Sequence, residues 1–124
     1  MVLTDTSVWI DHLRAGDAEL AARLEGGGVL CHPLVVLELA LGTLRARDEV
    51  LGLLDRLPAA PVAEPGEVRL LIERRRLFGR GIGYVDCALL ASCLMAPGTM
   101  LWTRDRRLGA AAAALGLGHP AGAG

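Results

Sequence analysis

Residues 1–13, MVLTDTSVWIDHL, join a short apolar segment directly to a stretch with helical spacing. Val2 to Thr4 predicts a buried strand, and from Val8 onward apolar side chains return at intervals typical of one helix face. Asp5 stands at the junction between the two. A carboxylate here either caps the first helical turn, as Asp often does, or belongs to a functional site. Both interpretations stay open at this point.

The same order of a short strand followed by helices recurs along the chain. We expect further strands at 29–31 and 100–102, with an edge strand around 61–63. We expect helices at 7–14, 18–25, 33–46, 48–57, 67–78, 85–96 and 106–115. Strands alternating with helices predict an α/β domain with a parallel sheet between helical layers. We expect one domain over residues 1–117, followed by a flexible Gly- and Ala-rich tail at 118–124.

The composition fits a single domain with a real core, because 52% of the 124 residues are hydrophobic. The chain has no apolar run of the roughly 18 to 20 residues that a membrane span needs. Its N-terminus has no basic segment followed by an apolar one, so we expect a cytoplasmic protein without a membrane anchor. The formal net charge of −1 neither requires nor excludes a nucleic-acid partner, although every Lys or Arg position is arginine.

The cysteines and histidines do not predict a metal site. Cys31, Cys87 and Cys93 are odd in number and form no C-x-x-C pair, which argues against disulfides and structural zinc. We expect them to be small, reduced core residues. The histidines are scattered along the chain, and His119 falls in the expected tail.

A few acidic residues stand beside apolar segments, whereas the others stand among polar neighbours: Asp5, Glu38, Asp86 and Asp105. An unpaired buried carboxylate is costly, so each of them needs a partner. Three of the four also suit a helix N-cap, but Glu38 lies within LVVLELAL, where it has no capping role. In a parallel α/β sheet, ligands bind at the edge formed by the carboxyl ends of the strands. We therefore expect all four side chains to point toward this edge. Oxygen ligands of this kind favour Mg²⁺ or Mn²⁺ over zinc.

Segments of the chain resemble, in order, the four motifs of PIN-domain nucleases, and most closely those of VapC-type toxins: DTSVWID (5–11), LELALG (37–42), GYVDCALLA (83–91) and WTRDRRL (102–108). The resemblance implies a three-layer α/β/α fold around a parallel sheet of four to five strands. It implies a catalytic, metal-binding quartet made of Asp5, Glu38, Asp86 and Asp105. Ser7 would orient Asp5, and Thr103 would supply the hydroxyl of the last motif.

Two positions depart from the pattern of this family. Its members often have Ser or Thr one turn before the motif glutamate, where this chain has Leu34 and Val35. They commonly end in a clear last strand, whereas LGLG at 115–118 is a poor strand sequence. The first departure removes a hydroxyl that would contact Glu38 from its own helix. The second leaves the C-terminal edge of the sheet without a clear strand.

The resemblance implies the toxin of a type II toxin–antitoxin pair, a Mg²⁺- or Mn²⁺-dependent endoribonuclease that hydrolyses RNA phosphodiester bonds. Its implied partners are an RNA substrate, a VapB-like antitoxin along the apolar helices near the N-terminus and at 44–57, and a second copy in a homodimer. Arg104, Arg106 and Arg107 flank Asp105 and are candidate RNA contacts. A second basic stretch is made of Arg69, Arg74, Arg75, Arg76 and Arg80. Within it, Arg74 to Arg76 are more simply interpreted as a solvated helix face.

Other functions stay open from the sequence alone. A nuclease of the same fold acting on DNA or in RNA processing, outside a toxin pair, would have the same acids. A non-catalytic RNA-binding regulator is a second alternative, against which the four intact acids argue. A phosphatase with Asp5 as nucleophile is a third, but such sites usually have a second acid two residues later, where this chain has Ser7.

Overall fold

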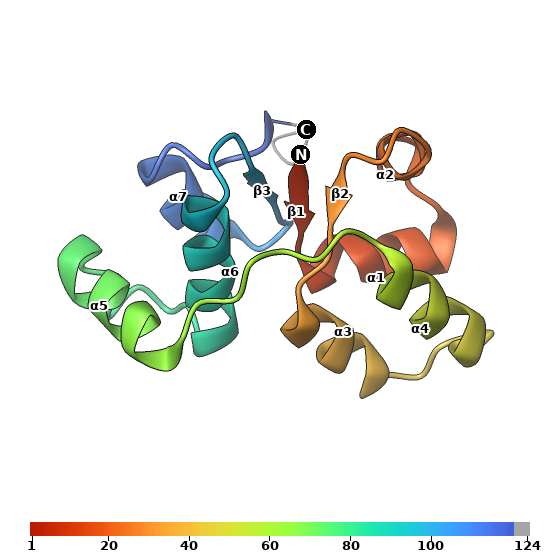
Figure 1. Ribbon diagram of the computed structural model, residues 1–124, viewed down its shortest axis with the longest axis horizontal. Helices are drawn as coiled ribbons and strands as arrows, with labels where there is room; N and C mark the ends of the chain where they lie inside the picture. Colours follow the sequence, from red (N-terminus) through yellow and green to blue (C-terminus); the bar gives the residue numbers. More distant parts are fainter. Residues whose placement is uncertain (121–124) are drawn as a thin grey trace.

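The structure, a computed structural model, describes residues 1–120 and contains a small sheet between two groups of helices (Figure 1). The strands are β1 (Val2–Thr4), β2 (Val29–Leu30) and β3 (Met100–Trp102). The helices are α1 (Thr6–Ala15), α2 (Ala18–Glu25), α3 (Pro33–Ala40), α4 (Arg47–Arg56), α5 (Pro65–Arg75), α6 (Tyr84–Met95) and α7 (Arg106–Ala114). The expected α/β class is confirmed.

The strand order is β2-β1-β3, and both pairings are parallel, as expected. Val2 of the central strand lies opposite Val29 on one side and Met100 on the other. The carboxyl ends of all three strands therefore meet at one edge of the sheet. The central strand is buried along its whole length, which explains its apolar Val2 and Leu3, and the buried Thr4 ends it before the junction with α1.

The sheet has three strands among the described residues, where four to five were expected. The expected edge strand at 61–63 is wrong, because the chain instead makes a single parallel bridge between Ala59 and Cys31. There the Cys31 N–H donates to the Pro58 carbonyl at 2.9 Å. Pro61 has no N–H with which to continue the ladder, so the pairing stops.

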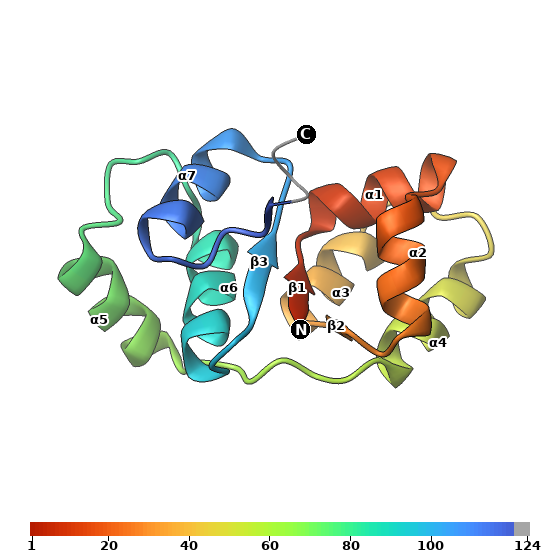
Figure 2. The ribbon, with the colours of Figure 1, turned by 90° about the horizontal axis from the view of Figure 1, so that it is seen from above.

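The helices lie in two groups on either side of the sheet (Figures 1 and 2). Helices α1 to α4 lie beside β1 and β2, whereas α5, α6 and α7 lie beside β3, and the chain between α4 and α5 crosses from one group to the other. The largest fully buried side chains include Trp9, Trp102, Leu3, Leu20, Leu54, Leu89, Leu90, Leu101 and Leu108. Within residues 1–120, no helix is long and apolar enough to cross a membrane.

The cysteines are free and buried, as expected from the sequence. Burial raises the pKa of Cys31 to about 11 and that of Cys93 to about 12. Both thiols therefore stay protonated at neutral pH, and they act as small core residues.

Helix α3 ends at Ala40, not near residue 46 as its apolar pattern predicted. The next residue, Leu41, is 88% exposed, and Gly42 follows it with its low helix propensity. The guanidinium of Arg47, the first residue of α4, donates to the Ala40 carbonyl at 2.9 Å. This bond satisfies one of the carbonyls that a helix leaves open at its C-terminus, so the chain turns here.

The chain remains bound to the sheet beyond residue 117, where the sequence predicted that the folded domain ends. Gly118 pairs with Leu101, and the His119 N–H donates to the Leu101 carbonyl at 3.0 Å. The His119 Nε2 also lies 2.6 Å from Glu19 Oε2 on α2. Gly118 and His119 therefore belong to the folded part of the chain, and the end of the expected tail, residues 121–124, lies outside the described residues.

Candidate functional site

Asp5 follows β1 directly, at the sheet edge where the strands end, and is only 7% exposed. Its Oδ1 accepts the Thr6 N–H at 2.8 Å, so it caps α1. Its Oδ2 accepts hydrogen bonds from the hydroxyls of Ser7 at 3.0 Å and Thr103 at 2.6 Å. The two interpretations of Asp5 are therefore compatible, because one oxygen caps the helix while the other meets residues of two different motifs.

Thr103 joins the first and last motifs across the β1–β3 pair. Its Oγ1 donates to Asp5 and accepts the Asp105 N–H at 3.0 Å. Ser7 makes a second link of this kind, since its Oγ accepts the Arg104 N–H at 3.1 Å. The two hydroxyls therefore fix both the Asp5 side chain and the backbone that leads to Asp105.

Glu38 lies on α3 and is linked to Asp5 through Thr6, a residue that the sequence did not single out. The Thr6 hydroxyl donates to Glu38 Oε1 at 2.7 Å. Leu34 and Val35 have no hydroxyl to offer Glu38, and Thr6 supplies one from α1 instead. Thr6 stands between Asp5 and Ser7 in the first motif, so the sequence could have pointed to it. Only the fold shows that the carboxylate it contacts is that of Glu38.

Asp86 lies in the first turn of α6, where its Oδ2 accepts the Gly83 N–H at 3.0 Å. Burial raises the pKa of Asp86, and the negative charges of the other three acids raise it further, against the opposing effect of the Gly83 N–H. Asp5, Asp105 and Glu38 are therefore all close enough to repel Asp86. The tertiary structure brings together acids from four separate motifs.

Asp105 caps α7, a role that its position in the sequence also suggested. Its Oδ1 accepts the Leu108 N–H at 2.9 Å. The bond between its own N–H and Thr103 holds it on the Asp5 side of the sheet edge. Capping and membership of the acidic cluster are again compatible in one residue.

No ion pair within residues 1–120 reaches this cluster; those present are Arg23–Glu19, His119–Glu19, Arg104–Asp11 and Arg104–Asp17. Close carboxylates without a cationic partner fit a hard divalent ion, for which carboxylate oxygens are preferred ligands. In the same part of the chain, no three acidic, histidine or cysteine side chains already converge on one coordination point. Each carboxylate is instead held by its own local donor, so coordination requires side-chain rotation.

Arg104 is engaged in ion pairs, and this differs from its expected role as an RNA contact. Its Nε lies 2.7 Å from Asp11 Oδ2, and its Nη2 lies 2.7 Å from Asp17 Oδ2. The Leu20 N–H, and then Arg104, hold the pKa of Asp17 below its usual value despite some burial. The guanidinium thus ties the segment after β3 to α1 and to the start of α2.

The other arginines of the sequence analysis are exposed. Arg106 and Arg107 lie in the first turn of α7 and make no ion pair within residues 1–120. The arginines of the second basic stretch are exposed as well, and their role stays a prediction. Within it, Arg80 Nε donates to the Arg76 carbonyl at 3.0 Å and so closes the end of α5.

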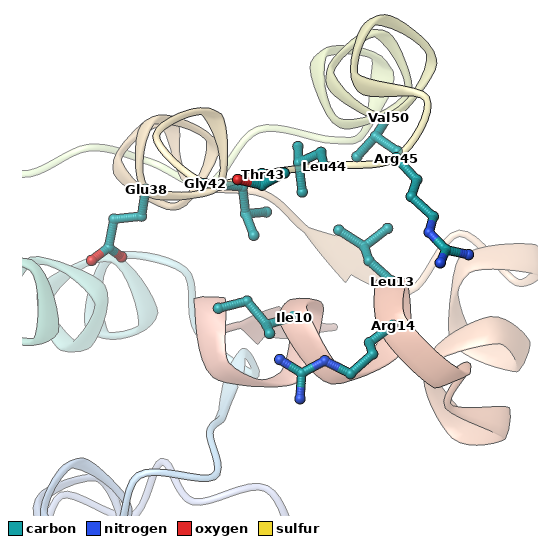
Figure 3. Close-up of a pocket in the computed structure, with 10 residues that line it drawn as sticks. Ile10, Leu13, Arg14, Glu38, Gly42, Thr43, Leu44, Arg45 and Val50 are labelled. Carbon is teal, nitrogen blue, oxygen red and sulfur yellow. The ribbon is translucent and has the colours of Figure 1, made fainter.

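A groove of about 400 Å³ begins at Glu38 and runs between α1, α3 and the segment that leads to α4 (Figure 3). It is lined by Ile10, Leu13, Arg14, Glu38, Leu39, Gly42, Thr43, Leu44, Arg45 and Val50. Figure 3 shows Leu13 and Leu44 facing one another in its middle, with Glu38 at one end and Arg45 at the other. The groove therefore has an apolar middle, a carboxylate at one end and the Arg45 guanidinium at the other, and Arg14 lines it from α1.

Comparisons with known proteins agree with this geometry. Residues 2–114 match the PIN domain family, and this range includes all four acids of the cluster. The chain is 54% identical over 117 residues, which is 94% of each protein, to Ribonuclease VapC32 of Mycobacterium tuberculosis strain H37Rv. It has the same identity and coverage to Ribonuclease VapC32 of strain CDC 1551.

Proposed function

We propose, on the premise that this chain belongs to the PIN-domain family and to the VapC ribonucleases within it, that it is a Mg²⁺- or Mn²⁺-dependent endoribonuclease. Its substrate on this proposal is RNA, cleaved by hydrolysis of phosphodiester bonds. It is the toxin of a type II toxin–antitoxin pair, and a cognate antitoxin holds it inactive.

The observation that supports this function is the acidic cluster at the carboxyl ends of the strands, which no cationic side chain of residues 1–120 neutralises. Asp5, Glu38 and Asp86 are the proposed metal ligands, and Asp105 is proposed to serve a second ion. A divalent cation, when bound, lowers the pKa of a coordinated water and stabilises charge on phosphate oxygens. Among the four acids, burial and the charges of its neighbours raise the pKa of Asp86, and a bound cation would relieve that repulsion.

The neighbouring polar groups have a positioning role in this proposal. Ser7 and Thr103 hold the Asp5 carboxylate in one rotamer, and Thr6 directs Glu38 toward it. These hydrogen bonds keep both carboxylates at the sheet edge, from which side-chain rotation brings them to the metal ion. Arg106 and Arg107 are the proposed contacts to RNA phosphates, because they are exposed beside Asp105 and have no carboxylate partner within residues 1–120.

Asp5→Asn tests the proposal, since it removes one carboxylate charge and keeps an oxygen that accepts the Thr6 N–H. We expect Mg²⁺- or Mn²⁺-dependent RNA cleavage to be lost while the circular dichroism spectrum stays unchanged. Asp48→Asn is the control, because Asp48 is exposed on α4 and should leave cleavage intact. Cleavage by Asp5→Asn at the parent rate would overturn the mechanism, and cleavage of DNA alone would overturn the substrate.

The groove that begins at Glu38 is the proposed antitoxin site. We propose as its occupant an apolar segment of the antitoxin with a basic side chain at Glu38 and an acidic one at Arg45, because these charges lie at the two ends of the groove. A cationic side chain at Glu38 would neutralise part of the acidic cluster and compete with the metal ion. Inhibition would then follow from occupation of the site itself.

Leu44→Glu tests the groove, because it places a carboxylate in the apolar lining. We expect it to abolish co-purification with the antitoxin and to leave RNA cleavage intact. Leu53→Glu is the matched control, since Leu53 lies on α4 outside this groove and is 42% exposed. Antitoxin binding by Leu44→Glu as tight as that of the parent would place the partner elsewhere.

We also propose a homodimer and a cytoplasmic location, and both rest on family membership. Sedimentation at micromolar concentration should give twice the 13.0 kDa chain mass. A single-chain mass across that range would exclude the dimer, and recovery of the protein from a membrane or secreted fraction would exclude the location.

A further inference from the structure

Two glycines between α5 and α6 have nearly the same backbone but different surroundings. Gly79 has a φ of +72° and Gly81 a φ of +74°, so any other residue meets a similar strain at either position. A Cβ placed on Gly79 would meet nothing within 4 Å. A Cβ placed on Gly81 would lie 2.5 Å from Arg107 Nη1, 2.8 Å from its Cδ and 3.0 Å from its Cζ. The Arg107 side chain therefore rests where the Cβ of any larger residue would be.

The contact between Gly81 and Arg107 connects the segment that leads to Asp86 with the segment that follows Asp105. Gly81 precedes α6, whose first turn contains Asp86, and Arg107 follows the Asp105 cap in the first turn of α7. The Cδ, Cζ and Nη1 atoms of Arg107 occupy the space in which a Cβ on Gly81 would lie, while the residue is exposed and makes no ion pair within residues 1–120. Its charge therefore has no carboxylate partner in this part of the chain and lies two residues after Asp105 in the sequence.

We propose that Arg107 binds an RNA phosphate next to the cleavage site and that Gly81 is a positioning residue, which acts by leaving room for the Arg107 side chain. This inference rests on the proposed ribonuclease function. An arginine fork matches a phosphate with two parallel hydrogen bonds, and a side chain already packed in place loses less freedom when it binds. Arg104 is paired with Asp11 and Asp17, so Arg107 is the better placed of these two arginines.

The pair of glycines supplies a matched experiment, done in the Asp5→Asn background so that RNA is bound without being cut. Affinity is measured by fluorescence anisotropy with a labelled single-stranded RNA over a range of salt concentrations. We expect Gly81→Ala and Arg107→Ala each to weaken binding by about ten-fold, which is the size of one charged phosphate contact. We expect each to reduce the slope of log affinity against log salt by about 0.7, the value for one phosphate on a single strand.

Gly79→Ala is the control for backbone strain, and Arg56→Ala is the control for net charge, because Arg56 is exposed at the end of α4 and makes no ion pair within residues 1–120. Gly79→Ala should lower the melting temperature as much as Gly81→Ala does and leave the salt slope unchanged. The double variant Gly81→Ala with Arg107→Ala should bind RNA no more weakly than Arg107→Ala alone, because both changes remove the same contact. Arg107→Lys should keep the salt slope and lose part of the affinity, since it keeps the charge without the fork.

Equal effects of Gly81→Ala and Gly79→Ala on RNA binding would overturn the positioning role. Equal effects of Arg107→Ala and Arg56→Ala on RNA binding would show that only net charge matters and would overturn the phosphate contact of Arg107. Neither arginine variant adds backbone strain that endangers folding. These outcomes are distinct from failure of the proposed function, in which the parent cleaves no RNA and the Asp5→Asn protein binds none.

Discussion

The Thr103 hydroxyl donates a hydrogen bond of 2.6 Å to Asp5 Oδ2, and this bond links the residue after β3 to the residue after β1. Thr103 is buried, as is Asp5. A hydroxyl that serves a buried carboxylate, and at the same time accepts the Asp105 N–H, connects two acids of the cluster through a single atom. The first prediction concerns this atom.

Thr103→Val keeps the shape of the side chain and removes the hydroxyl. We expect it to destabilise the protein by about 1–3 kcal/mol, because a buried charged acceptor loses a donor and the Asp105 N–H loses its acceptor. Thr103→Ser keeps the hydroxyl and should cost less. Urea unfolding of both variants measures the difference, and equal midpoints would show that the bond adds nothing to stability.

Divalent metal should stabilise the folded protein. A ligand that binds only the folded state at 100 times its Kd adds about 2.7 kcal/mol, so Mg²⁺ or Mn²⁺ should raise the melting temperature. The rise should disappear in Asp5→Asn, which lacks one of the proposed ligands. NaCl at the same ionic strength is the control, and an equal rise with NaCl would mean that general screening alone is responsible.

Asp86→Asn should stabilise the metal-free protein at neutral pH. Burial and the neighbouring acids raise the pKa of Asp86, so between its usual value of 3.8 and the raised value the folded state retains a proton that the unfolded chain has lost. Stability therefore falls as the pH rises through that interval, and the penalty remains above it. Asparagine removes the charge, so the gain should be present at pH 7 and absent below about pH 3.8.

The measurement for Asp86→Asn is chemical unfolding in EDTA at several pH values. RNA cleavage by the same variant should be lost, because a proposed ligand is missing. A stability gain that stays constant down to pH 3 would contradict the electrostatic explanation and point to packing.

Arg104→Ala should act on stability more than on RNA binding. Its guanidinium pairs with Asp11 and Asp17 at a partly exposed position, for which about 0.5–1 kcal/mol is the usual range. Asp11→Asn removes only one of these pairs and should cost less than Arg104→Ala. Thermal unfolding and RNA anisotropy, compared with Arg107→Ala, separate the two roles. A loss of RNA affinity in Arg104→Ala as large as in Arg107→Ala would show that Arg104 contacts an RNA phosphate, as the sequence suggested.

Helices and strands could be predicted where neighbouring residues in the sequence specify them. The strand before Asp5 and the helix after it follow from apolar spacing and a capping residue, and the structure has both. The end of α3 was not predictable, because the apolar pattern continues through Leu41 and Leu44 while the Arg47 guanidinium satisfies the Ala40 carbonyl. The same limit applies at the sheet edges, where single bridges depend on packing rather than on strand-forming sequence.

The sequence by itself determined the alternation of strands and helices, and it singled out four acids that interrupt apolar segments. Both are properties of neighbouring residues. Of the four acids the fold buries only Asp5, whereas Glu38 and Asp105 are exposed, so apolar neighbours in the sequence did not by themselves predict burial. Only the tertiary structure decided which donors the acids use, and that Arg104 is paired with carboxylates whereas Arg107 has no such partner within residues 1–120. Thr6 meets Glu38, Arg104 meets Asp11 and Asp17, and Arg107 rests on Gly81. These contacts join residues remote in the chain, so the packing of helices around the sheet sets them.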